Sequence, residues 1–114
     1  MRRLIATLVL LTVAAGRAWA AFDEGKAAFE RGDWPAALTQ WQPCAAAGDA
    51  ACQNGLGALY RLGRGVPQDL SAATAWFRKA ADQGFAKAQA NLAGMYAEGA
   101  GLSQDDVAAV QWYR

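Results

Sequence analysis

The sequence has no histidine, and this absence removes most of the chemistry on which a small enzyme relies. Without imidazole there is no general base that titrates near neutral pH, no Ser-His or Cys-His couple, and no zinc site of the Cys-His kind. Only two cysteines are present, and two ligands do not close a metal site. We therefore expect neither a cofactor nor a metal ion.

Charged residues are also scarce, at 18% of 114 residues, whereas 54% are apolar. A disordered chain needs low hydrophobicity and high net charge, and a two-domain enzyme needs about twice this length. The composition therefore predicts one small compact domain. Alanine is the commonest residue and β-branched residues are few, which favours an all-α fold.

The first twenty residues are organised like a secretory signal peptide. Arg2 and Arg3 give a positive start, and residues 4–15 carry no charge. Ala18 and Ala20 place small side chains at the two positions that a signal peptidase reads. The uncharged stretch is shorter than the roughly 20 residues that a membrane-spanning helix needs. A membrane anchor that is kept after export is the alternative to a cleaved signal peptide. We expect cleavage after Ala20, no stable membrane insertion afterwards, and a periplasmic or secreted protein.

Cleavage would also remove the basic excess of the chain. Of the 11 basic residues, Arg2, Arg3 and Arg17 precede the cleavage site, which leaves 8 against 10 acidic residues and a net charge of −2. Binding to phosphates requires clustered Lys and Arg, and no such cluster remains. We therefore expect no nucleic-acid partner.

An internal repeat with a period of 36 residues occupies residues 48–114. Shifting the chain by 36 gives thirteen identities within 31 aligned positions and needs no gap. The same shift applied backwards reveals a looser first unit. We expect a repeat domain over residues 21–114, with units at about 21–47, 48–83 and 84–114, the last of them incomplete.

Each unit is predicted to form two helices. Asp49 is suited to cap a helix over residues 50–62, which Gly63 ends by adopting positive φ. Asp69 is suited to cap a second helix over residues 70–83. A single helix pair cannot bury its apolar face, so successive pairs must stack into an αα solenoid of about five helices and a truncated sixth. The recurrence of tryptophan in the second helices predicts core filling rather than a ligand surface, at Trp34, Trp41, Trp76 and Trp112.

The best preserved unit carries the pattern Leu56-Gly57-x-x-Tyr60-x-x-Gly63-x-Gly65-Val66-Pro67-x-Asp69-x-x-Ala72-x-x-x-Trp76-Phe77-x-x-Ala80-Ala81-x-x-Gly84. This pattern resembles the Sel1-like repeat, a relative of the tetratricopeptide repeat. The resemblance covers residues 22–114 and is strongest over residues 48–114. It implies a non-catalytic scaffold that binds a protein or peptide partner.

The two cysteines extend this resemblance. Cys44 and Cys52 have a spacing similar to that of the secreted, cysteine-rich branch of the Sel1-like family, in which disulfides join adjacent helices. Their counterparts 36 residues later are Ala80 and Ala88, at positions where packed helices bring Cβ atoms close together. The resemblance implies a Cys44–Cys52 disulfide, and two separate buried thiols are the alternative.

By analogy with tetratricopeptide geometry, the first helices of the units line a concave groove for the partner. Arg61 and Lys87 are expected to pair with acidic groups, and Asn54 to bind a ligand backbone; ordinary solvated side chains are the alternative. The expected groove residues are Lys26, Asn54, Ala58, Arg61, Lys87, Ala90 and Gly94.

Secreted relatives with this cysteine pattern have been linked to penicillin binding and β-lactamase activity, which is the alternative function. The chain has only two serines, Ser71 and Ser103, and neither begins a Ser-x-x-Lys motif. We therefore expect no catalytic residue and no enzymatic activity.

The last helix stops at Arg114 without its glycine end or a polar capping repeat, which is expected to leave an apolar edge. A longer repeat protein of which this chain is a fragment would explain that edge. Self-association or coverage by a partner is the alternative.

Overall fold

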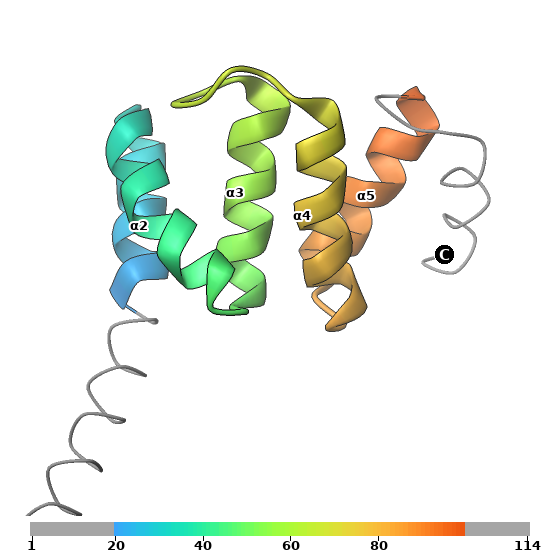
Figure 1. Cartoon of the computed structure of the whole chain (residues 1–114), viewed down its shortest axis with the longest axis horizontal. Coiled ribbons are helices and arrows are strands. Elements are labelled where there is room, and N and C mark those ends of the chain that lie inside the picture. Colours follow the sequence, from blue (N-terminus) through green and yellow to red (C-terminus); the bar gives the residue numbers. More distant parts are fainter. Residues whose placement is uncertain (1–19, 100–114) are drawn as a thin grey trace, which may run out of the picture.

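The computed structural model describes residues 20–99, and its regular structure over this range is entirely helical (Figure 1). Residues 20–30 form an N-terminal helical segment. It is followed by α2 (Trp34–Ala46), α3 (Ala50–Leu62), α4 (Leu70–Asp82) and α5 (Ala86–Glu98). Each helix packs on the next, as α2 on α3, α3 on α4 and α4 on α5. The fold is therefore the expected all-α solenoid of stacked helix pairs. The predicted signal peptide, sixth helix and apolar end, including Trp112, fall outside the described residues.

Aspartate side chains fix where three of the helices begin. Asp33, Asp49 and Asp69 each accept a hydrogen bond from the backbone N–H three residues later, at 3.2, 2.8 and 3.0 Å. Each bond satisfies one of the N–H groups that a helix start leaves without an intrahelical partner. The predicted caps at Asp49 and Asp69 are confirmed, and the second helix of that unit ends one residue earlier than predicted, with Gln83 as its C-cap.

The indole of Trp41 organises the packing of the first unit against the second. A Cβ atom at Gly25 would lie 2.2 Å from Trp41 Nε1, and one at Gly55 would lie 2.7 Å from Trp41 Cδ2. The ring therefore occupies space that any side chain at these two glycines would need. Trp41 Nε1 donates a hydrogen bond to the carbonyl of Phe22 at 3.1 Å, which fixes the ring relative to the N-terminal helical segment.

The other described tryptophans are less buried than Trp41, which is 4% exposed. Trp34 and Trp76 are half-buried. The Arg64 guanidinium lies 4.4 Å from the centroid of Trp34, and the Lys79 ammonium lies 4.7 Å from that of Trp76. Trp41 therefore fills the core as predicted. Trp34 and Trp76 are only partly buried, and each makes a cation–π contact through one ring face.

The same hydrogen bond joins successive units at both described junctions. Gln53 Nε2 donates to the carbonyl of Ala45 at 3.2 Å, and Gln89 Nε2 donates to the carbonyl of Ala81 at 3.2 Å. The two bonds are one 36-residue period apart. Each ties the first helix of one unit to the end of the preceding helix, so the repeated glutamine has a structural explanation.

Cys44 and Cys52 form the implied disulfide, with an S–S distance of 2.05 Å and a Cα–Cα distance of 5.9 Å. The bond joins the end of α2 to the start of α3, and both residues are buried. One period later, Ala80 and Ala88 occupy the equivalent places and are fully buried. The first junction between units is therefore joined by a disulfide, whereas the second junction has two alanine methyl groups in the same places.

Replacing Gly55 with alanine should destabilise the protein. The new methyl group overlaps the Trp41 indole, and overpacking of this kind costs about 1–3 kcal/mol. Gly94→Ala is the matched control, because a Cβ at Gly94 meets no described atom within 4 Å. Alanine should there raise the free energy of unfolding by about 0.5–1 kcal/mol through its better helix propensity. Urea unfolding followed by circular dichroism measures both changes, and equal stability of the two variants would contradict the packing of Trp41.

Removing the disulfide should lower the free energy of unfolding by about 2–3 kcal/mol on the chain-entropy estimate for so short a loop. The double variant Cys44→Ala with Cys52→Ala tests this in urea, because it reproduces the alanine pair of the next unit and leaves packing largely intact. In the denatured, unreduced wild-type protein we expect no reactive thiol, and a count of two would refute the bridge.

Candidate functional site

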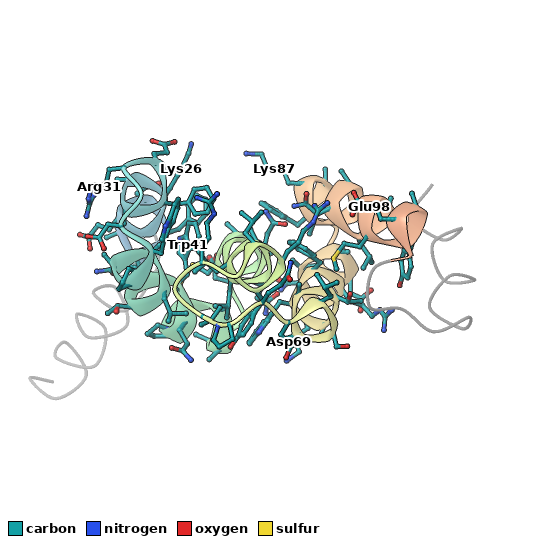
Figure 2. The ribbon with its side chains drawn as sticks, turned by 90° about the horizontal axis from the view of Figure 1, so that it is seen from above. Lys26, Arg31, Trp41, Asp69, Lys87 and Glu98 are labelled. Carbon is teal, nitrogen blue, oxygen red and sulfur yellow. A yellow bond between two sulfur atoms is a disulfide. The ribbon has the colours of Figure 1, made fainter. Side chains whose placement is uncertain are left out.

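The N-terminal helical segment, α3 and α5 together line a groove on one side of the solenoid (Figure 2). A hollow of about 500 Å³ lies at the start of α3, and a second of about 240 Å³ lies further along the same helix. We call these two adjoining hollows the concave groove. Four residues line both hollows: Phe22, Ala51, Phe85 and Lys87.

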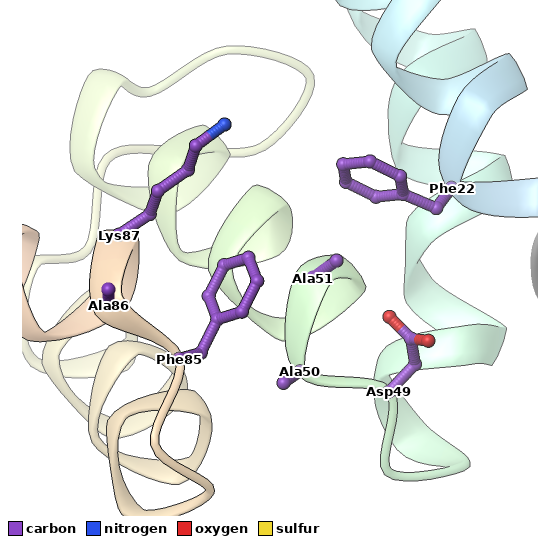
Figure 3. Close-up of a pocket in the computed structure, with 7 residues that line it drawn as sticks. All are labelled: Phe22, Asp49, Ala50, Ala51, Phe85, Ala86 and Lys87. Carbon is purple, nitrogen blue, oxygen red and sulfur yellow. The ribbon is translucent and has the colours of Figure 1, made fainter.

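The walls of the concave groove are aromatic and its floor is aliphatic. Phe22 and Phe85 stand on opposite sides, with Ala50 and Ala51 of α3 between them (Figure 3). Asp49 is the acidic residue among those that line the larger hollow, and its Oδ1 already accepts the N–H of Cys52. The larger hollow therefore offers an apolar surface to an occupant.

Phe85 takes the place that a helix cap holds in the preceding unit. It lies 36 residues after Asp49 and is the N-cap residue of α5, but it makes no side-chain capping hydrogen bond. Loss of such a cap typically costs about 1 kcal/mol. The third unit therefore gives up part of the local stability of α5 and gains one wall of the groove.

Two lysines extend over the groove from opposite walls. Lys26 on the N-terminal helical segment and Lys87 on α5 are both exposed and lie on the two sides of the groove (Figure 2). Among residues 20–99, neither forms an ion pair. The smaller hollow is consequently lined by two positive charges and by no acidic residue among those described.

Polar contacts between α3 and α5 continue along the groove. Asn91 Nδ2 donates to Asn54 Oδ1 at 2.9 Å. Further along α3, the Arg61 guanidinium lies 3.2 Å from a carboxylate oxygen of Glu98. The exposed fractions of these two side chains are 31% and 60%, so the ion pair is accessible to water and contributes little to stability.

The structure distributes the seven predicted groove residues unevenly. Lys26, Asn54, Ala58 and Lys87 line the groove. Arg61 is engaged with Glu98, while on α5 Ala90 is exposed and Gly94 is half-buried, and none of the three lines either hollow. No observation tests whether any of the seven contacts a partner, so these roles stay predictions.

Sequence reasoning missed the two phenylalanines that form the walls. For Phe85 there was a usable signal, because it breaks the repeat at a position where Asp49 acts as a cap. Phe22 lies one helical turn before Lys26 and on the same helix face. The first unit matches the other two only loosely, so no residue of those units could be aligned with Phe22 to reveal its role. An apolar residue at a predicted helix-cap position, such as Phe85, can thus indicate that the side chain belongs to a groove and does not cap the helix.

Over residues 20–99 there is no group of three or more His, Cys, Asp or Glu side chains placed to hold a metal ion. No helix in this range combines the length and the apolar character needed to cross a bilayer. Ser71 is exposed in the first turn of α4, and Ser103 falls outside the described residues.

Comparison with known proteins identifies the repeat. Residues 50–85 and 86–114 each match the model of the Sel1 repeat. This chain belongs to the Sel1 repeat family. Its fold is similar to that of a Sel1 repeat protein from Oxalobacter formigenes, known from a crystal structure, with a TM-score of 0.72 and 39% sequence identity. That similarity covers 82% of this Sel1 repeat chain but only 38% of the other protein.

No curated protein sequence matches the chain significantly. Sel1 repeat proteins are generally scaffolds for protein–protein interaction.

Proposed function

We propose that this Sel1 repeat chain is an exported, non-catalytic scaffold that binds a protein or peptide in its concave groove. The observation that carries the proposal is the apolar hollow between Phe22 and Phe85, which is large enough for a ligand and has no occupant among residues 20–99. Ligand sites typically measure about 300–1,000 Å³ and are mostly apolar with a few polar groups. The repeated first helices hold such a surface on rigid elements.

Two features support export to the periplasm or beyond. The first twenty residues have the order of charge, apolar stretch and small residues that a signal peptidase requires. The Cys44–Cys52 disulfide belongs in an oxidising compartment, because thiols stay reduced in the cytosol. Both features fit a scaffold that works in the cell envelope or outside the cell.

Filling the groove should abolish partner binding. Ala51 lies on the floor between the two phenylalanines, so Ala51→Arg places a long side chain in the hollow without disturbing buried packing. Ala75→Arg makes the same change at an exposed position of α4. Chemical crosslinking and affinity purification from the native cell envelope should recover a partner with wild type and Ala75→Arg, and at least about tenfold less of it with Ala51→Arg. Equal recovery with both variants would rule out the groove.

Export is tested by expressing the whole chain in a Gram-negative host. We expect the protein in the periplasmic fraction, with an intact mass that corresponds to loss of residues 1–20. A host strain that lacks periplasmic disulfide formation should yield the same processed chain with two free thiols. Unprocessed protein confined to the cytosol would contradict export.

A further inference from the structure

The chemistry of the groove says more about its occupant than that it is a protein. Phe22 and Phe85 face each other across Ala51, and no described side chain fills the space between them (Figure 3). Two aromatic faces separated by an aliphatic floor favour a large apolar group, which would remove all three surfaces from water. One side chain of a ligand is therefore expected to be aromatic or a large aliphatic.

The smaller hollow, which Phe22 and Phe85 also line, is positive, because Lys26 and Lys87 line it and no acidic residue is among its described lining residues. Lys26 and Lys87 approach it from opposite walls, and neither has an acidic partner among residues 20–99 (Figure 2). Asp49 lines the larger hollow and not the smaller one, and its carboxylate caps α3. Two ammonium groups that line the same hollow repel each other, and an anionic group between them converts that repulsion into two attractions. The occupant is therefore expected to carry a carboxylate beside its apolar side chain.

Asn54, which lines the smaller hollow and is hydrogen-bonded to Asn91, favours a polypeptide over other anions. Asn91 donates to Asn54, which leaves the Nδ2 of Asn54 as a donor and the Oδ1 of Asn91 as an acceptor with no bond among the described residues. Each residue of a peptide backbone presents one donor and one acceptor. A fatty-acid chain presents neither, so it would leave this pair unused.

The length of the groove limits the occupant to a short segment. Ala50 and Ala58 mark its ends along α3, and eight residues of helix measure about 12 Å. An extended peptide advances about 3.3 Å per residue, so about four residues fit. Beyond Ala58 the charges of Arg61 and Glu98 satisfy each other.

We infer that the concave groove binds a short acidic peptide segment, with one large apolar side chain between Phe22 and Phe85 and a carboxylate held by Lys26 and Lys87. The inference rests on the proposed function and narrows its partner to a stated chemistry. The other occupants that such a surface could take, a neutral or basic peptide and an anionic lipid surface, are outcomes of the test below.

An unbiased selection tests the composition of the ligand. A phage-displayed library of random heptapeptides is panned against the whole chain as purified, and in parallel against Phe85→Asp. This variant removes one apolar wall but introduces the cap that Asp49 provides in the preceding unit, so the helix it begins should remain folded. Peptides that bind wild type and not Phe85→Asp are expected to be enriched in Asp or Glu next to Phe, Trp, Tyr or Leu.

A defined probe then measures the contribution of the lysines. The probe is a fluorescein-labelled hexapeptide with one phenylalanine between two glutamates, and its binding is followed by fluorescence polarisation. Lys87→Glu and Lys26→Glu should each weaken binding about tenfold or more, since each replaces an attraction with a repulsion. Lys79→Glu on α4 carries the same charge change over Trp76, away from the groove, and should bind as wild type does. Replacing the phenylalanine of the probe with serine should also abolish measurable binding.

The outcomes separate this inference from the proposed function. Groove-dependent peptides of neutral or basic composition, or probe binding that is unchanged in both lysine variants, would overturn the acidic ligand and leave the scaffold proposal standing. Peptides that bind Ala51→Arg as well as wild type would defeat both. Absence of any enriched peptide, together with lysine-dependent binding to phosphatidylglycerol vesicles, would replace the peptide with a membrane surface.

Discussion

The structure depends above all on the close approach of helices around the Trp41 indole. The ring fits because Gly25 and Gly55 have no side chains, and its N–H is fixed by the carbonyl of Phe22. This packing sets the position of the N-terminal helical segment relative to α3. Phe22 therefore serves twice, since its backbone fixes the indole and its ring forms one wall of the concave groove. Core packing and the concave groove share one set of contacts, so a substitution at either glycine should change the shape of the groove.

The junctions between units show how a repeat can preserve geometry while changing chemistry. At both described junctions a glutamine donates to the end of the preceding helix, at Gln53 and Gln89. The first junction adds a disulfide where the second has only Ala80 and Ala88. A covalent link restricts the unfolded chain. It is found at the junction with the looser first unit, whose two helices are joined by a short turn without the glycine-bracketed loop of the next unit.

The helices and their stacking could be predicted from the sequence, whereas most of the residues that line the groove could not. Residues whose role is local or periodic could be read directly, as with the caps at Asp49 and Asp69 and the end of α3 at Gly63. Groove residues depend on which side chains from different units face one another across space, and no local rule fixes that. Thus Arg61 looked available for a ligand until the structure placed it beside Glu98, 37 residues further along the chain.

The repeat itself explains why the groove was harder to read. The 36-residue period persists where helices pack, because the same side chain must fill the same space in each unit. At the groove the repeat is kept at Ala50 and Ala86 but is broken at two other pairs, where Asp49 is replaced by Phe85 and Ala51 by Lys87. None of these residues is fully buried, although Phe85 packs partly against the core, so these positions can differ between units. In this stacked repeat, aligned positions that differ between units, such as Asp49 and Phe85, therefore change the chemistry of the concave groove without changing how the helices stack.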